Sequence, residues 1–164
     1  MTRAPSRGHR TRFVVSAVAL VLASALSACT PASLWTWGRG TSGQLGTGTT
    51  TNALTPAQAG GATWSALGAG QDHSCGIRSD QTLWCWGYND EGQLGTGGSQ
   101  NQVAPVPVGT ATWKAVSAGR VHTCGIRTSG SLWCWGYNGS GQLGDGTTSD
   151  RRSPVQVGSA AWKS

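Results

Sequence analysis

The chain has 164 residues, of which 26 are glycine and only 11% are charged, and its formal net charge is +6. Four of its 12 basic residues precede Cys29, so the remainder carries 8 basic and 6 acidic residues and a net charge of about +2. These eight basic residues are scattered rather than gathered into the patch or stripe that nucleic-acid binding needs. We therefore expect no nucleic-acid partner.

Residues 1–28 have the pattern of a lipoprotein-type signal peptide. Arginines precede an apolar run over residues 13–26, which is shorter than the ~20 residues that a membrane-spanning helix needs. A basic start, an apolar middle and small residues at the end are typical of an export signal that is removed. Leu26-Ser27-Ala28-Cys29 resembles the lipobox of bacterial lipoproteins, which implies a lipid on Cys29 that anchors the exported chain to a bacterial membrane or cell surface. An ordinary signal peptide followed by a cysteine is the alternative.

After a short linker at residues 29–33, one sequence unit occurs three times. Leu-Trp-Thr-Trp-Gly at 34–38 and Leu-Trp-Cys-Trp-Gly at 83–87 and 132–136 lie 49 residues apart, and Gly-Gln-Leu-Gly follows each at the same offset. A fixed period of about 20–50 residues predicts stacked supersecondary units. We divide the chain into repeats at 34–82, 83–131 and 132–164.

Each unit predicts short antiparallel strands and no helix. Residues 122–127 and 131–136 are β-prone runs separated by a turn, which is the pattern of a hairpin. Pro105 and Pro107 suit an edge strand, because proline donates no hydrogen bond to a neighbouring strand. Four short strands in each 49-residue unit predict a β-propeller blade. The fold class is therefore all-β, an open propeller with about 2.7 blades present, in which the third repeat is truncated as in a fragment.

Four cysteines form two pairs, ten residues apart in each: Cys75, Cys85, Cys124 and Cys134. An even number of cysteines in an exported chain predicts disulfides. A hairpin closed by a three-residue loop sets Cys75 opposite Cys85 at a non-hydrogen-bonded position, where Cα atoms lie about 4.5 Å apart, within the reach of a disulfide. The same register sets Gly76 opposite Trp84, which leaves room for a large ring. Metal binding is the alternative, but the CxxC spacing of zinc sites is absent from the sequence.

The repeat unit resembles that of the regulator of chromosome condensation family, whose hallmark is Trp-Gly, a nearby Asn and then Gly-Gln-Leu-Gly. The residues that carry this signature are Trp86, Gly87, Asn89, Gly92, Gln93, Leu94, Gly95, Trp135, Gly136, Asn138, Gly141, Gln142, Leu143 and Gly144. The first repeat departs from it with Gly40 in place of the Asn. The resemblance implies a propeller, usually of seven blades. Kelch repeats have a similar period, but the double glycines at 60–61 and 97–98 lie 37 residues apart, out of register with the repeat.

No set of residues predicts catalysis. Asp72-His73-Ser74 suggests a hydrolase, but the matching residues 121–123 are Val-His-Thr, so the acid does not recur. Neighbouring residues of a strand also point to opposite faces, which separates the members of a triad. The tryptophans recur in register, which favours core packing over a sugar-binding platform. We expect no catalytic, cofactor or metal site, and we expect that the protein is not an enzyme.

The leading hypothesis is a non-catalytic scaffold at the bacterial cell surface or in the periplasm that binds a protein partner. Loops differ between copies, as Gln100-Asn101-Gln102 differs from Thr148-Ser149-Asp150, and such loops would choose the partner. The family resemblance leaves two alternatives. One is a regulator of a small GTPase that acts in guanine-nucleotide exchange, as the best-known member of the family does. The other is a secreted enzyme inhibitor of the propeller type.

Overall fold

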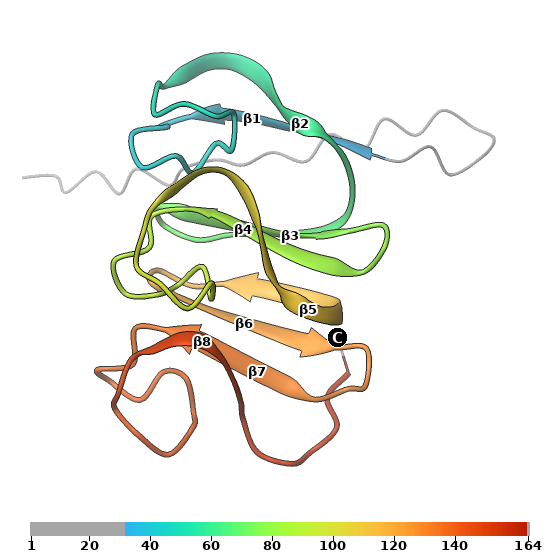
Figure 1. Ribbon diagram of the computed structural model, residues 1–164, viewed down its shortest axis with the longest axis vertical. Helices are drawn as coiled ribbons and strands as arrows, with labels where there is room; N and C mark the ends of the chain where they lie inside the picture. The colour runs from blue at the N-terminus through green and yellow to red at the C-terminus, as the bar shows by residue number, and fades with distance from the viewer. Residues whose placement is uncertain (1–31, 164) are drawn as a thin grey trace, which may run out of the picture.

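The computed structural model describes residues 32–163, so the predicted signal peptide and Cys29 lie outside the described part of the chain. Eight strands form one open sheet in chain order, each antiparallel to the next (Figure 1). They are β1 (Ala32–Gly38), β2 (Ala53–Ala69), β3 (His73–Arg78), β4 (Thr82–Gly87), β5 (Gln102–Ala118), β6 (His122–Arg127), β7 (Leu132–Gly136) and β8 (Arg151–Gln156). The prediction of an all-β, open partial propeller is confirmed. Within residues 32–163, no helix is long and apolar enough to cross a membrane.

The two longest strands each belong to two blades. Residues 53–64 of β2 pair with β1, as Trp35 does with Gln58, and residues 64–69 pair with β3, so Trp64 lies where the two pairings meet. Strand β5 joins β4 to β6 in the same way. The sequence predicts separate short strands here, but each is one bent strand of 17 residues. Gly60 and Gly109, at φ of +67° and +62°, lie midway and turn the backbone without ending the strand.

Residues 32–163 therefore contain two complete blades and part of a first one, stacked along the long axis of Figure 1. The first blade is β1 with the first half of β2. The second blade is the second half of β2, β3, β4 and the first half of β5, and the third blade is the second half of β5 with β6, β7 and β8. A 49-residue sequence unit thus runs from the middle of one blade to the middle of the next.

The hairpin register predicted from the cysteines is observed. Cys75 faces Cys85 in the second blade and Cys124 faces Cys134 in the third. Each pair is joined by a disulfide, with Cα atoms 4.0 and 4.1 Å apart. The ring that fills the space at Gly76 differs from the prediction, however. A Cβ at Gly76 would come within 2.6 Å of Trp64 of β2, on the neighbouring strand, so Trp64 rather than Trp84 requires the glycine.

Paired tryptophans form the core between each complete blade and the blade before it. Trp86 and Trp135 are fully buried, and their ring centroids lie 5.4 and 5.6 Å from those of Trp64 and Trp113. Such tilted contacts contribute about 0.5–1.5 kcal/mol beyond the buried area. The expected core role of the recurring tryptophans holds for these four residues. Trp35 is 40% exposed, so the pattern does not extend unchanged into the first blade.

Candidate functional site

A backbone carbonyl joins each blade to the next. The carbonyl oxygen of Gln44 accepts hydrogen bonds from the indole N–H of Trp86, at 2.9 Å, and from the hydroxyl of Ser74, at 3.0 Å. We call this arrangement the carbonyl clamp. The carbonyl of Gln93 makes the second clamp, with Trp135 at 2.9 Å and Thr123 at 2.8 Å in the third blade. Both clamps are buried, so they connect blades rather than bind a ligand.

The glycines of the signature allow the clamped tryptophan to approach. A Cβ at Gly46 would lie 2.7 Å from the indole nitrogen of Trp86, and one at Gly95 would lie 2.6 Å from that of Trp135. Both glycines also have positive φ, which other residues rarely adopt. The Gly-Gln-Leu-Gly turns therefore serve the packing of the next blade.

The signature Asn closes the loop that follows it. The Asn89 amide donates to the carbonyls of Gly98 and Gln100, both at 3.1 Å, and its side-chain oxygen accepts the N–H of Leu94 at 2.9 Å. Asn138 makes the equivalent bonds in the third blade. The signature residues of the second repeat are thus engaged inside the fold, whereas in the third repeat Gly144 is exposed.

One comparison of loops made from the sequence is wrong by a single residue. Asn101 accepts the backbone N–H of Asn89 at 2.7 Å, and Asp150 accepts that of Asn138 at 2.6 Å. Asn101 is therefore the counterpart of Asp150. The comparison of residues 100–102 with residues 148–150 is out of register by one residue. Because both side chains hold a loop, partner choice cannot depend on this position alone.

The residues that suggested a hydrolase each engage a different group. Asp72 forms an ion pair of 3.2 Å with Arg39, and Ser74 donates to the clamp carbonyl. The ring of His73 is 1% exposed, and its Nε2 lies 2.9 Å from the Thr123 hydroxyl of the third blade. Burial, and to a lesser degree His122, lowers the pKa of His73 to about 4. The three side chains therefore do not form a triad.

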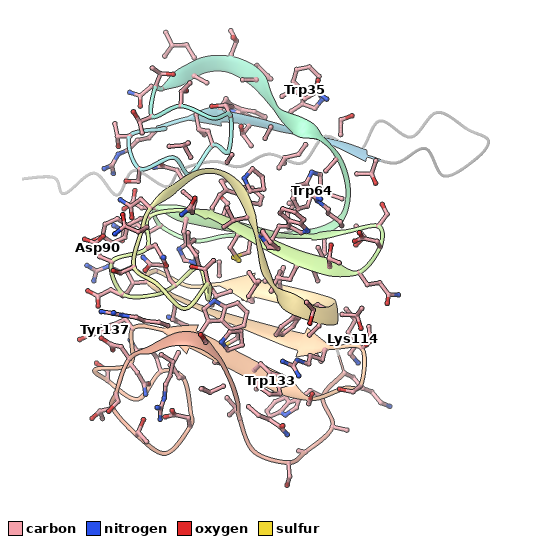
Figure 2. The ribbon with its side chains drawn as sticks, viewed as in Figure 1. Trp35, Trp64, Asp90, Lys114, Trp133 and Tyr137 are labelled. Carbon is pink, nitrogen blue, oxygen red and sulfur yellow. A yellow bond between two sulfur atoms is a disulfide. The ribbon has the colours of Figure 1, made fainter. Side chains whose placement is uncertain are left out.

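A hollow of about 390 Å³ lies where the loops of the second and third blades meet. We call it the tyrosine hollow, and its lining is Gln71, Asp72, Tyr88, Glu91, Arg120, Val121 and Tyr137. Arg120 donates to Gln71 across the junction at 3.1 Å. Figure 2 places Tyr137 on the same side of the molecule as Asp90, away from Lys114. Tyr88 donates to Asp90 at 2.9 Å, and this bond raises the pKa of the tyrosine.

Sequence reasoning missed both the clamp and the tyrosine hollow. Tyr88 and Tyr137 directly follow the signature Gly and recur 49 residues apart, which is a signal that could have been used. The clamp had no such signal, because a backbone carbonyl has the same chemistry in every residue. Within residues 32–163, no group of His, Cys, Asp and Glu is arranged to hold a metal ion.

Comparison with known proteins supports the same architecture. The model of the Regulator of chromosome condensation (RCC1) repeat matches residues 32–77, 80–126 and 129–161, and a second model with this description matches residues 64–93 and 113–142. No curated protein matches the chain in sequence.

Among solved structures, Prp20p from Saccharomyces cerevisiae is similar, with a TM-score of 0.71 and 20% identity over 78% of this chain and 34% of that one. Human WBSCR16 gives a TM-score of 0.68 and 22% identity over 77% of this chain and 35% of that one. The chain thus spans about a third of the length of these relatives, which show the fold. Because the family model matches more than half of its residues, the chain belongs to the regulator of chromosome condensation repeat family.

Proposed function

We propose that the protein is a non-catalytic scaffold that binds a protein partner at the tyrosine hollow. The observation that carries this proposal is the pair Tyr88 and Tyr137, half-buried on one side of the molecule and accompanied by Asp72, Glu91 and Arg120. Tyrosine and arginine are enriched where proteins bind each other, because they combine large contact area with hydrogen bonding. The signature residues of the second repeat are engaged inside the fold, whereas the hollow is open to a partner.

Relatives of the same fold bind proteins. Prp20p has reported binding properties to Gsp1p and histones, and it has been solved with Kap60 bound. Regulation of a small GTPase is the second candidate function, supported by the structural likeness to Prp20p and the family's best-known role. A secreted enzyme inhibitor is a narrower form of the same binding role.

The location that we propose is outside the cytoplasm, with a lipid anchor on Cys29. The two disulfides support an oxidising compartment, since disulfides persist in exported proteins and are rare in the cytosol. The anchor is tested by feeding labelled fatty acid to cells that produce the full chain or its Cys29→Ala variant. Label on the first chain alone supports the anchor, and label on both or on neither contradicts it.

The binding role is tested by capture from envelope extracts with the full chain. We expect the double variant Tyr88→Ala and Tyr137→Ala to lose a partner that the wild type retains. Lys114→Ala, on the other side of the molecule in Figure 2, is the matched control and should retain the partner. Equal capture by all three chains contradicts the proposal. Recovery of a GTPase whose nucleotide exchange the chain accelerates favours the second candidate.

A further inference from the structure

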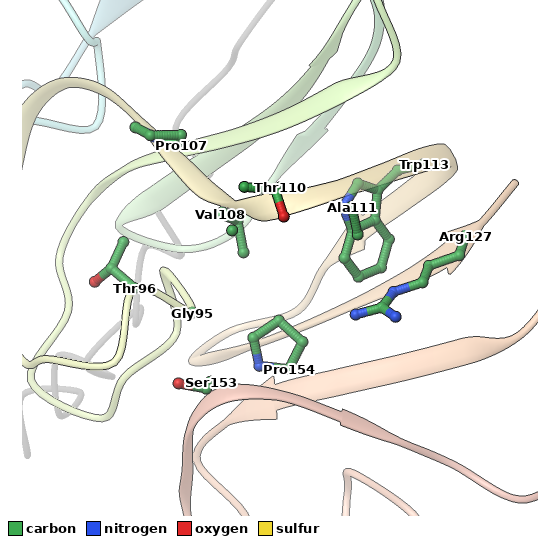
Figure 3. A pocket seen from close by; sticks show the side chains of 11 residues that line it. Gly95, Thr96, Pro107, Val108, Thr110, Ala111, Trp113, Arg127, Ser153 and Pro154 are labelled. Carbon is green, nitrogen blue, oxygen red and sulfur yellow. The ribbon is translucent and has the colours of Figure 1, made fainter.

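A second hollow, of about 440 Å³, lies between β5 and β8 at the same pair of blades (Figure 3). We call it the arginine groove, and the argument concerns Pro107, Val108, Trp113, Arg127 and Pro154 of its lining. Figure 3 shows the guanidinium of Arg127 directed towards Pro154, beneath the indole of Trp113. The lining contains this one cation and no acidic residue, so its charge favours an anion.

The guanidinium of Arg127 packs against two tryptophan rings, but no carboxylate of the described residues pairs with its charge. Its guanidinium carbon lies 3.6 Å from the ring centroid of Trp133 and 5.4 Å from that of Trp113. Over residues 32–163, the ion pairs are Arg39–Asp72 and Arg151–Asp145, so no carboxylate of the described chain pairs with Arg127. Its Nε is buried without a hydrogen-bond acceptor. Burial also lowers the pKa of the guanidinium, which marks a cation partly removed from water.

Trp113 also lines the hollow, with its indole N–H beneath the surface, as that of Trp64 is in the second blade. The residue is 1% exposed, and its indole N–H is buried without an acceptor among the described residues. Indole and guanidinium groups only donate hydrogen bonds, and a buried donor without a partner destabilises the fold. Because Arg127 is only partly buried, its guanidinium is the group that a ligand of this groove meets, and such a ligand must supply acceptor oxygens and negative charge.

The walls restrict the ligand further. Pro107, Val108 and Pro154 are apolar residues of the lining, and Figure 3 places all three on the side towards which the guanidinium points. Prolines offer no N–H for a ladder, so an added strand is disfavoured here and side-chain contacts must hold the ligand. A nucleic acid would need several cations along a track, whereas this lining has one. A carboxylate on an apolar stem, as in glutamate, fits both the donors and the walls.

We propose that the arginine groove binds an acidic side chain from an extended segment of the partner protein, with the carboxylate on Arg127 and the segment lying between Pro107 and Pro154. This inference rests on the proposed protein-binding function and names the chemistry of the partner. Charge-assisted, two-point bonds from arginine to a carboxylate are about twice as strong as neutral ones.

The second blade offers a matched control. Arg78 stacks at 3.4 Å over Trp84 and at 5.5 Å over Trp64, and its Nε is also buried without an acceptor. Arg78→Met therefore removes the same kind of stack while leaving the arginine groove unchanged. Arg127→Met removes the cation from the groove itself. Arg127→Lys keeps the charge but loses the planar fork, so it provides a less disruptive variant.

The test uses the full chain and a fluorescent, end-blocked octapeptide with one central glutamate among alanines and prolines, compared with its glutamine counterpart. Fluorescence anisotropy should show at least tenfold tighter binding of the glutamate peptide. Arg127→Met should abolish this preference, Arg127→Lys should reduce it, and Arg78→Met should retain it. The indole N–H resonance of Trp113, assigned with Trp113→Phe, should shift with the glutamate peptide only.

Three results would overturn the proposal: equal binding of both peptides, equal loss in Arg78→Met and Arg127→Met, or displacement of the peptide by succinate at matched concentration. The last would mean that the groove holds any small carboxylate. The Tyr88→Ala and Tyr137→Ala double variant separates the two proposals, because it should lose partner capture but keep the glutamate preference. If capture depends on the tyrosines and no preference exists, the groove proposal alone fails.

Discussion

The junction between the first and second blades and the junction between the second and third share the clamp but differ beside it. At the first, the Gln44 amide nitrogen donates to Asp72 at 3.3 Å. At the second, Val121 occupies the position of Asp72, and the amide nitrogen of Gln93 is buried without an acceptor. The backbone carbonyl of each glutamine nevertheless accepts a hydrogen bond from a tryptophan of the next blade. The backbone therefore provides the constant part of the junction, and the side chains provide the variable part.

The largest effect is expected from removing the clamped tryptophan. Trp86→Ala and Trp135→Ala should each lower the free energy of unfolding by ~3–5 kcal/mol, because a large buried ring leaves a cavity. Urea unfolding followed by circular dichroism measures the change. Trp162→Ala, at a side chain that is 45% exposed, is the control and should change little. Trp86→Phe and Trp135→Phe lose the indole bond and part of the buried ring, so each should cost more than the ~1 kcal/mol of the bond alone and less than the alanine variant. Unequal losses at the two sites would contradict the equivalence of the clamps.

Acid should weaken the molecule through His73 more than through His122. Burial lowers the pKa of His73 from 6.5 to about 4, whereas His122 is less buried and its pKa is also lowered. At a pH between 4 and 6.5, His73 is protonated in the unfolded chain but neutral in the folded chain. The contribution of His73 is thus complete above pH 6.5 and is lost as the pH falls towards 4, by at most about 3 kcal/mol.

Free energies of unfolding measured from pH 7 to pH 4 test this difference. His73→Gln should flatten the pH dependence strongly and His122→Gln weakly. The opposite order would show that the contact between His73 and Thr123 does not govern acid sensitivity.

Reduction should destabilise the two blades that contain a disulfide more than the first blade, which has none among the described residues. Each bridge closes a loop between cysteines ten positions apart and should contribute ~2–3 kcal/mol. The first blade has Thr36 at the matching position, where the hydroxyl donates to the Leu45 carbonyl at 2.8 Å. Urea unfolding with and without reductant measures the loss. Intact mass should rise by two hydrogens per bridge, and an unchanged mass would contradict the pairing.

The smallest effect should come from exchanging the side chains that distinguish the junctions. Val121→Asp offers the Gln93 amide an acceptor like Asp72 and should raise the free energy of unfolding by ~0.5–1.5 kcal/mol at pH 7. Asp72→Val should lower it by a similar amount, because Gln44 and Arg39 lose their partner. Thermal unfolding compares both with the wild type. A loss of stability in Val121→Asp would show that the first junction is not a template for the second.

The sequence predicted relations within a hairpin and failed at relations between copies. The pairing of Cys75 with Cys85 depends on residues ten apart, and a turn fixes it. The contact of Gly46 with Trp86 joins two copies, and periodicity shows which residues are equivalent but not which copy each one contacts. The continuity of β5 was also missed, because Gly109 marks a bend as readily as an end. The tyrosine hollow and the arginine groove depend on blade packing, so neither could be predicted residue by residue.

The sharing of β2 and β5 between blades has a consequence for how such proteins change in length. Because the sequence unit begins in mid-blade, inserting or deleting 49 residues joins the leading half of one blade to the trailing half of another. The recombined blade has the usual order of strands, and every clamp is rebuilt from matching halves. Gene duplication can then change the number of blades in whole steps while keeping the same contacts between neighbouring blades.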